Sequence, residues 1–216
     1  MKIFIDSADP AEIIEARRLG CADGVTTNPT LILKQGVKDL EGRIREIAAL
    51  VSGPVNAEVT STTAAEIIAE GKRLHKCGDN VFVKIPLNHE GLLACKALAD
   101  DGIRSTMTLV FSPGQAILAA AAGAAWICPF VGRLDDISYD GMDLIRRVSD
   151  IYRNDAEWNT QILVASVRSP VHVIEAAEAG ADGVTLPFSV IRQMAQHPLT
   201  DRGIAQFLVD AGKTAK

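Results

Sequence analysis

Lys84 stands inside an apolar run, Val81-Phe82-Val83-Lys84-Ile85-Pro86. A lysine in a buried strand must point into the interior, where loss of hydration disfavours the ammonium and lowers the pKa of the amine. A neutral amine is the form that attacks a carbonyl carbon. The sequence therefore predicts Schiff-base chemistry at Lys84. The alternative is a structural lysine that snorkels to the surface or forms a salt bridge.

Two carboxylates accompany expected strands and suit proton transfer. Asp6 ends the run Lys2–Asp6, and Glu58 lies in Val55-Asn56-Ala57-Glu58-Val59 on the same face as Asn56, because side chains alternate along a strand. Asp6 could instead cap the next helix, although Ser7 and Asp9 are also available for that. Glu58 could be the buried ion-pair partner of Lys84, which would not exclude catalysis.

Polar residues also occur at the ends of other expected strands. Asn28 follows Gly24–Thr27 and precedes Pro29, so it is a candidate substrate ligand or simply part of an Asn-Pro turn. Thr106 and Thr108 alternate at the end of a strand, where β-branched residues are also ordinary strand formers.

Two arginines, Arg133 and Arg168, come just after late strands. Guanidinium groups beside helix N-termini suit a phosphate, which barrels often bind on this side. The alternative is a surface ion pair with Asp135 or Asp136.

Eight short apolar runs alternate with helical stretches and would carry these residues. Several runs are continuously apolar, as strands buried on both faces are. The runs are Lys2–Asp6, Gly24–Thr27, Val55–Val59, Val81–Pro86, Ile103–Leu109, Trp126–Phe130, Gln161–Ser166 and Gly183–Leu186. An open nucleotide-binding sheet would favour a GxGxxG motif, which is absent from the sequence. We therefore predict an α/β fold, a (β/α)8 TIM barrel formed by one domain over residues 1–216.

Small residues mark the expected helix ends. We predict a left-handed glycine after each of six helices, at Gly20, Gly53, Gly78, Gly102, Gly123 and Gly180. Asp9, Ser112 and Ser169 each precede a proline and are expected N-caps. The segment Ala22–Thr26 recurs as Ala181–Thr185, an echo between two βα units.

An additional amphipathic helix is expected beyond the eighth unit. Residues Thr200 to Ala211 place Ile204, Phe207 and Leu208 on one face, within a C-terminal extension over 198–216. An apolar face needs a partner, which favours a homo-oligomer.

Composition excludes several classes of function. The net charge of −5 and the lack of a basic stripe argue against nucleic-acid binding. No apolar stretch approaches the length that spans a bilayer, and no signal peptide is expected. The four cysteines lack CxxC pairing and are expected to be reduced, as in the cytoplasm. The four histidines lack ligand spacing, so no metal site is predicted.

Seven segments, in order over nearly the whole chain, together resemble the transaldolase family in its short subgroup. They are Phe4-Ile5-Asp6, Gly24-Val25-Thr26-Thr27-Asn28-Pro29-Thr30, Ala57-Glu58-Val59, Val83-Lys84-Ile85-Pro86, Thr108-Leu109-Val110-Phe111-Ser112, Pro129-Phe130-Val131-Gly132-Arg133 and Ala165-Ser166-Val167-Arg168. The same family contains fructose-6-phosphate aldolases of this length and fold.

The resemblance implies a role for each residue. Lys84 would form the Schiff base with a ketose phosphate, and Asp6 would take the proton from the hydroxyl whose loss splits the carbon–carbon bond. Glu58 would shuttle protons through a water held near Thr108. The substrate-binding set would be Asn28, Thr26, Arg133, Ser166, Arg168, Phe130 and Thr106. The dihydroxyacetone unit would pass to an aldose phosphate in the pentose phosphate pathway, with no metal or organic cofactor.

Two residues favour the transaldolase branch. The aldolases resemble this chain but carry Gln in place of Glu58 and Tyr in place of Phe130. The chain departs from many transaldolases at Thr106, where Asn is usual, and at Cys128, where Ser is frequent. The alternatives are an aldolase that releases free dihydroxyacetone and a non-catalytic sugar-phosphate binding barrel. The short subgroup also implies a pentamer or decamer.

Overall fold

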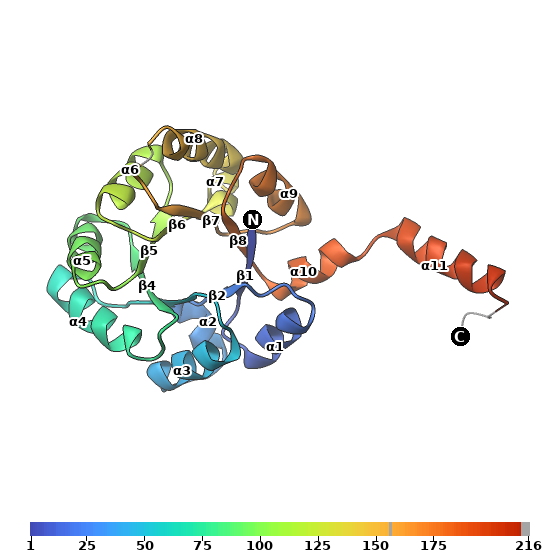
Figure 1. Ribbon diagram of the computed structural model, residues 1–216, viewed down its shortest axis with the longest axis horizontal. Helices are drawn as coiled ribbons and strands as arrows, with labels where there is room; N and C mark the ends of the chain where they lie inside the picture. The colour runs from blue at the N-terminus through green and yellow to red at the C-terminus, as the bar shows by residue number, and fades with distance from the viewer. Residues whose placement is uncertain (156, 213–216) are drawn as a thin grey trace.

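Eight parallel strands close into a barrel in the order β1-β2-β3-β4-β5-β6-β7-β8, with helices around it (Figure 1). The computed structural model describes residues 1–155 and 157–212. The strands are β1 Lys2–Asp6, β2 Gly24–Thr26, β3 Val55–Glu58, β4 Val81–Pro86, β5 Ser105–Val110, β6 Trp126–Pro129, β7 Gln161–Val164 and β8 Gly183–Leu186. Each lies within one or two residues of a predicted run, and the predicted (β/α)8 barrel is confirmed.

The helices alternate with the strands as the apolar periodicity predicts. They are α1 Pro10–Arg18, α2 Pro29–Lys34, α3 Leu40–Leu50, α4 Ala64–His75, α5 His89–Asp100, α6 Pro113–Ala121, α7 Val131–Asp135, α8 Gly141–Arg153, α9 Pro170–Glu178, α10 Phe188–Ala195 and α11 Pro198–Asp210. The two short helices α2 and α7 directly follow β2 and β6, and therefore lie at the carboxyl ends of those strands.

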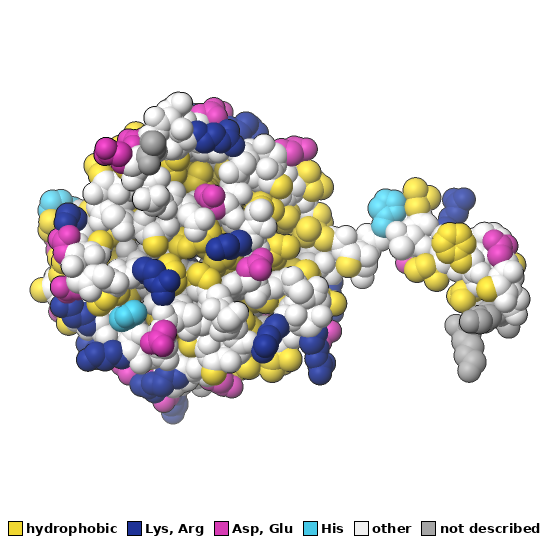
Figure 2. Space-filling model, in the orientation of Figure 1, with side chains coloured by type: hydrophobic (Ala, Val, Ile, Leu, Met, Phe, Trp, Pro, Cys, Tyr) yellow, Lys and Arg dark blue, Asp and Glu magenta, His cyan; other side chains and the backbone are white. Residues whose placement is uncertain are grey.

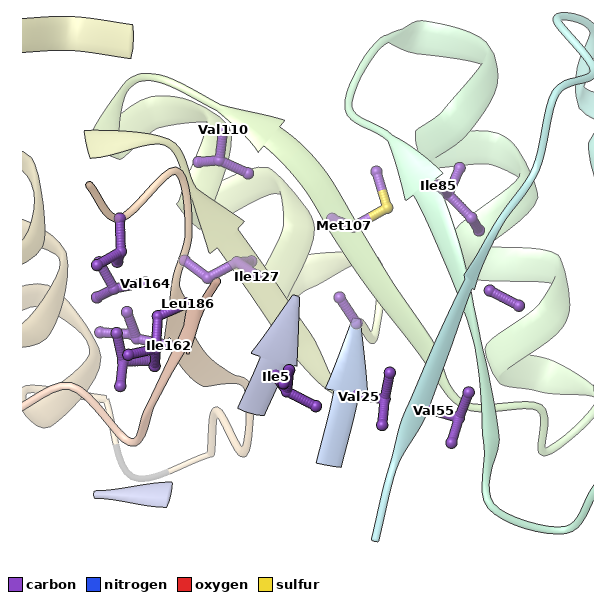
Figure 3. Packing of buried hydrophobic residues seen from close by; sticks show 14 of the residues in the cluster. Ile5, Val25, Val55, Ile85, Met107, Val110, Ile127, Ile162, Val164 and Leu186 are labelled. Carbon is purple, nitrogen blue, oxygen red and sulfur yellow. The ribbon is translucent and has the colours of Figure 1, made fainter. Parts of the chain in front are cut away.

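Aliphatic side chains fill the layer between the barrel wall and the helices. Figure 3 shows Ile5, Val25, Val55, Ile127 and Val164 on this outward face of their strands, and each is fully buried. Because side chains alternate along a strand, the neighbouring residues in β1 and β2, including Asp6 and Thr26, point into the barrel. This alternation separates the apolar core from the polar interior.

Large side chains fill the barrel interior toward the amino ends of the strands. Phe4, Phe82, Trp126 and Leu163 form a buried cluster with Cys128, and the ring of Phe4 meets Trp126 edge-on at 5.5 Å. Phe4 precedes Asp6 in β1, and Phe82 precedes Lys84 in β4. The interior is therefore a packed plug with a polar layer above it, at the carboxyl ends of the strands.

The predicted helix caps are confirmed in part. Asp9 Oδ1 accepts a hydrogen bond from Ala11 N at 2.8 Å, and Ser112 Oγ accepts one from Gln115 N at 3.2 Å. Ser169 holds the N-cap position of α9, but its side chain makes no capping bond to a described residue.

The left-handed glycines are confirmed at four of six positions, Gly20, Gly102, Gly123 and Gly180. The prediction is wrong for Gly53 and Gly78, whose backbones lie outside the left-handed region. Space explains why glycine occurs there: a Cβ on Gly53 would collide with Asp23 O, and one on Gly78 would lie 2.9 Å from Ala48 Cβ.

The echo between residues 22–26 and 181–185 has a structural counterpart. Asp23 Oδ2 accepts from Ile3 N, and Asp182 Oδ2 accepts from Ile162 N, each at 2.8 Å. Each aspartate thus ties its own strand to the start of the preceding one. The two strands concerned, β2 and β8, flank β1 in the barrel.

The predicted C-terminal helix is present as α11 and extends away from the ring (Figure 1). Its apolar side chains are exposed (Figure 2), including Leu199, Ile204, Phe207 and Val209. Positions 213–216 of the predicted extension lie outside the described residues. Among the described helices, none is long and apolar enough to cross a membrane.

Candidate active site

Lys84 is the centre of the polar layer. It lies in β4 opposite Glu58 of β3, and its Nζ is 2.9 Å from Glu58 Oε2 and donates to Thr27 O at 3.2 Å. The two side chains are 5% and 14% exposed, respectively. The ion pair considered from sequence is thus present, and it sits in a water-poor site where electrostatic interactions are strong.

The charge state of Lys84 differs from the sequence-based prediction. Burial acts to lower the pKa of Lys84, but the neighbouring carboxylate of Glu58, with a smaller effect from Asp6, outweighs it and raises that pKa above its ordinary value. The predicted lowering is therefore wrong, because it weighed the burial of the amine and not the carboxylates that barrel closure brings beside it. The resting side chain is an ammonium and must lose a proton before it can attack a carbonyl carbon.

Asp6 faces the same layer from β1. Thr26 Oγ1 donates to Asp6 Oδ1 at 2.7 Å. Burial raises the pKa of Asp6, while the positive charge of Lys84 and the Thr26 hydrogen bond partly offset the rise. Asp9, and not Asp6, caps α1. The capping alternative for Asp6 is thus removed, and the site holds a carboxyl group that titrates closer to neutrality than usual.

Two threonines of β5 lie beside this group, in different settings. Thr106 pairs with Lys84 in the sheet register and donates a hydrogen bond to Asn56 Oδ1. Thr108 is fully buried, and its Oγ1 makes no hydrogen bond to any described residue. A buried hydroxyl without a protein partner is costly, so Thr108 offers a hydrogen-bonding position to a molecule in the site.

Asn28 lies at the carboxyl end of β2 and caps α2, since its Oδ1 accepts from Leu31 N at 2.9 Å. The turn alternative therefore accounts for the side-chain oxygen of Asn28. Its amide NH2 group is left as a donor, so a local structural role and a substrate contact are compatible.

The two arginines occupy different environments. Arg168 forms a two-pronged ion pair with Asp136, in which Nη2 donates to Oδ2 at 2.6 Å. The guanidinium of Arg133 lies over the ring of Phe130, 4.9 Å from its centre. The ion-pair alternative is therefore realised for Arg168. Half of the Arg168 side chain stays exposed, which leaves donors for a second anion.

Ser166, in the loop after β7, lies against Gly132 of α7, the short helix that follows β6. Ser166 has a left-handed backbone with φ of 61°, a conformation that costs a non-glycine residue about 1–2 kcal/mol. A Cβ on Gly132 would collide with Ser166 O and lie 2.8 Å from Arg168 Nε. The absence of a side chain at Gly132 thus brings Ser166 and Arg168 against α7.

Cys128 is fully buried in β6 and is electrostatically coupled to Lys84, Glu58 and Asp6. Burial raises the pKa of the Cys128 thiol to about 12, so it is neutral and unreactive at physiological pH. The residues that are described contain no cluster of three or more His, Cys, Asp or Glu side chains that could hold a metal ion.

Sequence reasoning missed several participants. Thr185 donates or accepts a 2.6 Å hydrogen bond with Thr26, and the echo of residues 22–26 was the available signal for it. The carbonyl of Thr27, which accepts from Lys84, carried no signal because it belongs to the backbone. Asp136 was foreseen only as a competing ion-pair partner for an arginine.

A separate hollow of about 660 Å³ lies at the opposite end of the barrel, where Lys2, Phe82, Arg104 and Trp126 stand at or near the starts of their strands. It contains none of the predicted site residues. Barrel enzymes carry their chemistry at the carboxyl ends of the strands, which is where Lys84 and the two carboxylates lie.

The fold and this buried lysine–carboxylate centre define a class, the (β/α)8-barrel enzymes. Within it, residues 3–215 match the model of the Transaldolase/Fructose-6-phosphate aldolase family, and the chain belongs to that family. It is 58% identical to a probable transaldolase of Myxococcus xanthus (strain DK1622), over all of this chain and 96% of the relative.

Further relatives agree in length and name. The chain is 54% identical to a probable transaldolase of Caulobacter vibrioides (strain NA1000 / CB15N) and 53% identical to one of Desulfatibacillum aliphaticivorans. These matches cover the whole of this chain and 99% and 100% of the relatives. The predicted family, and its short subgroup, are confirmed.

Proposed function

We propose that this chain is a transaldolase of the pentose phosphate pathway. It moves a dihydroxyacetone unit from fructose 6-phosphate or sedoheptulose 7-phosphate to an aldose phosphate through a Schiff base on Lys84. The observation that carries the proposal is the buried pair of Lys84 Nζ and Glu58 Oε2, 2.9 Å apart, because it joins a nucleophile to a proton acceptor.

Glu58 activates Lys84 by accepting its proton. The freed amine attacks the ketose carbonyl carbon, and the carbonyl oxygen takes up a proton to give a carbinolamine. Glu58 returns a proton through a water that bonds Thr108 Oγ1, water leaves, and an iminium remains. This role gives the buried, unpartnered hydroxyl of Thr108 the partner it lacks among the described residues.

Asp6 then performs the carbon–carbon cleavage. Its carboxylate takes the proton of the hydroxyl on the carbon next to the bond that breaks, the aldose phosphate departs, and the bonding electrons flow toward the iminium to form an enamine. The raised pKa of Asp6 suits a group that accepts a proton here and returns it when the acceptor aldehyde adds.

The remaining residues bind the substrate. The Asn28 amide and Ser166 come just after the carboxyl ends of β2 and β7. We assign them to the hydroxyls of the sugar, together with Thr26 at the end of β2 and Thr106 within β5. Arg133 and Arg168 grip the phosphate, with half of Arg168 free for it beside Asp136. Phe130 presents an apolar ring that donates no proton, so the enamine awaits an acceptor. The residues supply all of this chemistry without a metal or organic cofactor.

Borohydride trapping tests the proposal directly. Reduction in the presence of fructose 6-phosphate should add the mass of a reduced dihydroxyacetone adduct at Lys84, located by peptide mass spectrometry. Lys84→Met is the negative variant, and Lys96→Met, an exposed lysine paired with Asp100, is the matched control. An unmodified wild-type chain would favour the non-catalytic sugar-phosphate binding barrel.

The competing activity is fructose-6-phosphate aldolase. It is considered because this chain carries threonine at position 106, where Asn is usual in transaldolases. The two are separated by measuring dihydroxyacetone with and without erythrose 4-phosphate or glyceraldehyde 3-phosphate. Transfer requires the acceptor, whereas rapid release without it would establish the aldolase.

We also propose a homo-oligomer, a pentamer or decamer, in which α11 docks on a neighbouring copy. None of the described residues of α11 is buried in the single chain. The large apolar side chains of Leu199 and Phe207 are 64% and 73% exposed, and such a surface favours a protein partner. Light scattering at micromolar concentration should give a multiple of 23.0 kDa. Phe207→Asp should reduce that mass, whereas Gln206→Asp, a neighbour outside the apolar set, should not.

The chain is further proposed to act as one domain, residues 1–216, in the cytoplasm. All four cysteines are free, including the buried Cys77, Cys95 and Cys128, which suits a reducing compartment. The net charge of −5 gives no attraction to nucleic acid, so small sugar phosphates are the proposed partners.

A further inference from the structure

Two threonines from different strands form a hydrogen-bonded chain that ends on Asp6. Thr26 of β2 lies opposite Asp6 in the register and donates to its Oδ1 at 2.7 Å. Thr185 of β8, on the other side of β1, has its Oγ1 2.6 Å from Thr26 Oγ1. Thr26 is 1% exposed and Thr185 4% exposed, so bulk water is excluded from this chain.

Counting protons fixes the direction of these hydrogen bonds. A carboxylate can only accept, so the single hydroxyl proton of Thr26 goes to Asp6. The hydrogen bond between the two hydroxyls must then be donated by Thr185 to Thr26. Thr185 therefore strengthens Thr26 as a donor, since hydrogen bonds in a chain polarise one another.

We propose that Thr185 is a positioning residue for the acid–base group Asp6 and acts on it through the Thr26 hydroxyl. This inference rests on the proposed function, in which Asp6 carries the proton of the cleavage step. Thr185 needs no contact with the substrate for this role. Through Thr26 it fixes the position of Asp6 Oδ1 and stabilises the carboxylate form of Asp6.

The other titratable groups of the site must be kept constant in a test. The Lys84 ammonium from β4 acts on Asp6 directly, and the Glu58 carboxylate from β3 and the neutral Cys128 thiol from β6 lie around that ammonium. None of them contacts Thr185 in the described hydrogen-bond network. A change at Thr185 therefore reaches Asp6 through Thr26, while the nucleophile and its carboxylate keep their own partners.

The pH dependence of kcat/KM for fructose 6-phosphate with saturating acceptor tests this inference. The Asp6 carboxylate is required, so its pKa sets an acid limb; the substrate phosphate titrates near pH 6 equally in every variant. Thr185→Val should move the limb upward by on the order of half a pH unit, and Thr26→Val by about one unit. Thr185→Ser should restore the wild-type limb.

Thr160→Val is the matched control, because Thr160 is a buried threonine whose Oγ1 donates to Ala124 O at the other end of the barrel. It should lower the melting temperature and leave the limb in place. An unmoved limb in Thr185→Val, or an equal loss at every pH, would overturn the inference. If that variant does not fold, Thr185→Cys, a weak donor, replaces it.

Asp6→Asn separates this inference from the function on which it rests. Full activity in Asp6→Asn would overturn the role of Asp6 itself. Loss of activity in Asp6→Asn together with an unmoved limb in Thr185→Val would overturn the role of Thr185 alone.

Discussion

Lys84 Nζ and Glu58 Oε2 lie 2.9 Å apart on adjacent strands, with both side chains nearly buried. The pair holds an ammonium and a carboxylate where neither is well hydrated, and each compensates the other. Glu58 thereby suppresses the nucleophile at rest and stands where it can remove the proton. The same contact is thus a structural ion pair and the first step of the proposed reaction.

Glu58→Gln should separate these two effects. Without the carboxylate, burial dominates and the pKa of Lys84 falls, so the amine becomes neutral at lower pH. The midpoint of borohydride trapping against pH should move down, while the maximal trapping rate drops about 10²-fold because the proton shuttle is lost. Glu15→Gln, an exposed residue beside Arg18, is the control. A midpoint that stays or rises would contradict this account.

Phe130→Tyr should shift transfer toward aldol release. The Phe130 ring follows β6 and meets Phe111 edge-on at 5.9 Å, and tyrosine keeps this ring and adds only a hydroxyl. A phenol there can protonate the enamine, and free dihydroxyacetone should form without an acceptor at least about tenfold faster. Phe207→Tyr, on exposed α11, should change nothing. Equal release in the two variants would argue against a proton donor at position 130.

Gly132→Ala should weaken substrate phosphate binding. The new Cβ meets Ser166 O and Arg168 Nε, and a misplacement near 1 Å costs up to about 10²-fold. KM for fructose 6-phosphate should rise by about tenfold or more. Gly203→Ala, whose Cβ meets nothing within 4 Å, should leave KM unchanged and stabilise α11 slightly. An unchanged KM in Gly132→Ala would show that the arginine is not held by this contact.

Glu70→Gln should destabilise the fold at neutral pH. The Glu70 carboxylate, 6% exposed, accepts from Thr60 N, Ser61 N and Thr60 Oγ1 in the loop after β3. The variant should lose about 1–3 kcal/mol in urea unfolding. Glu66→Gln, on the exposed side of α4, should change the free energy of unfolding by less than about 0.5 kcal/mol.

The pH dependence of the wild-type stability follows from the same carboxylate. Burial opposes the charge of Glu70, but hydrogen bonds from Ser61 and Thr60 outweigh it and hold its pKa below the ordinary 4.5. The folded state therefore gains stability above pH 4.5 and loses it as the pH falls through the lowered pKa. The gap between wild type and Glu70→Gln should close below that pKa.

The sequence by itself determined the order of strands and helices and which strand ends carry polar side chains. Continuous apolar runs, proline-led helix starts and period-two alternation are local signals, so the strand bearing Lys84 could be located from it. Seven ordered segments also determined the family. Alternation of side chains along the preceding strand was enough to place Glu58 on the same face as Asn56.

Only the tertiary structure decided what those polar residues do to one another. The charge of Lys84 depends on Glu58 and Asp6, which are 26 and 78 positions away in the chain and meet only when the barrel closes. Thr185 reaches Thr26 across 159 positions. Electrostatic and hydrogen-bond energies depend on distances of a few ångströms and on exclusion of water, and neither is written in local sequence.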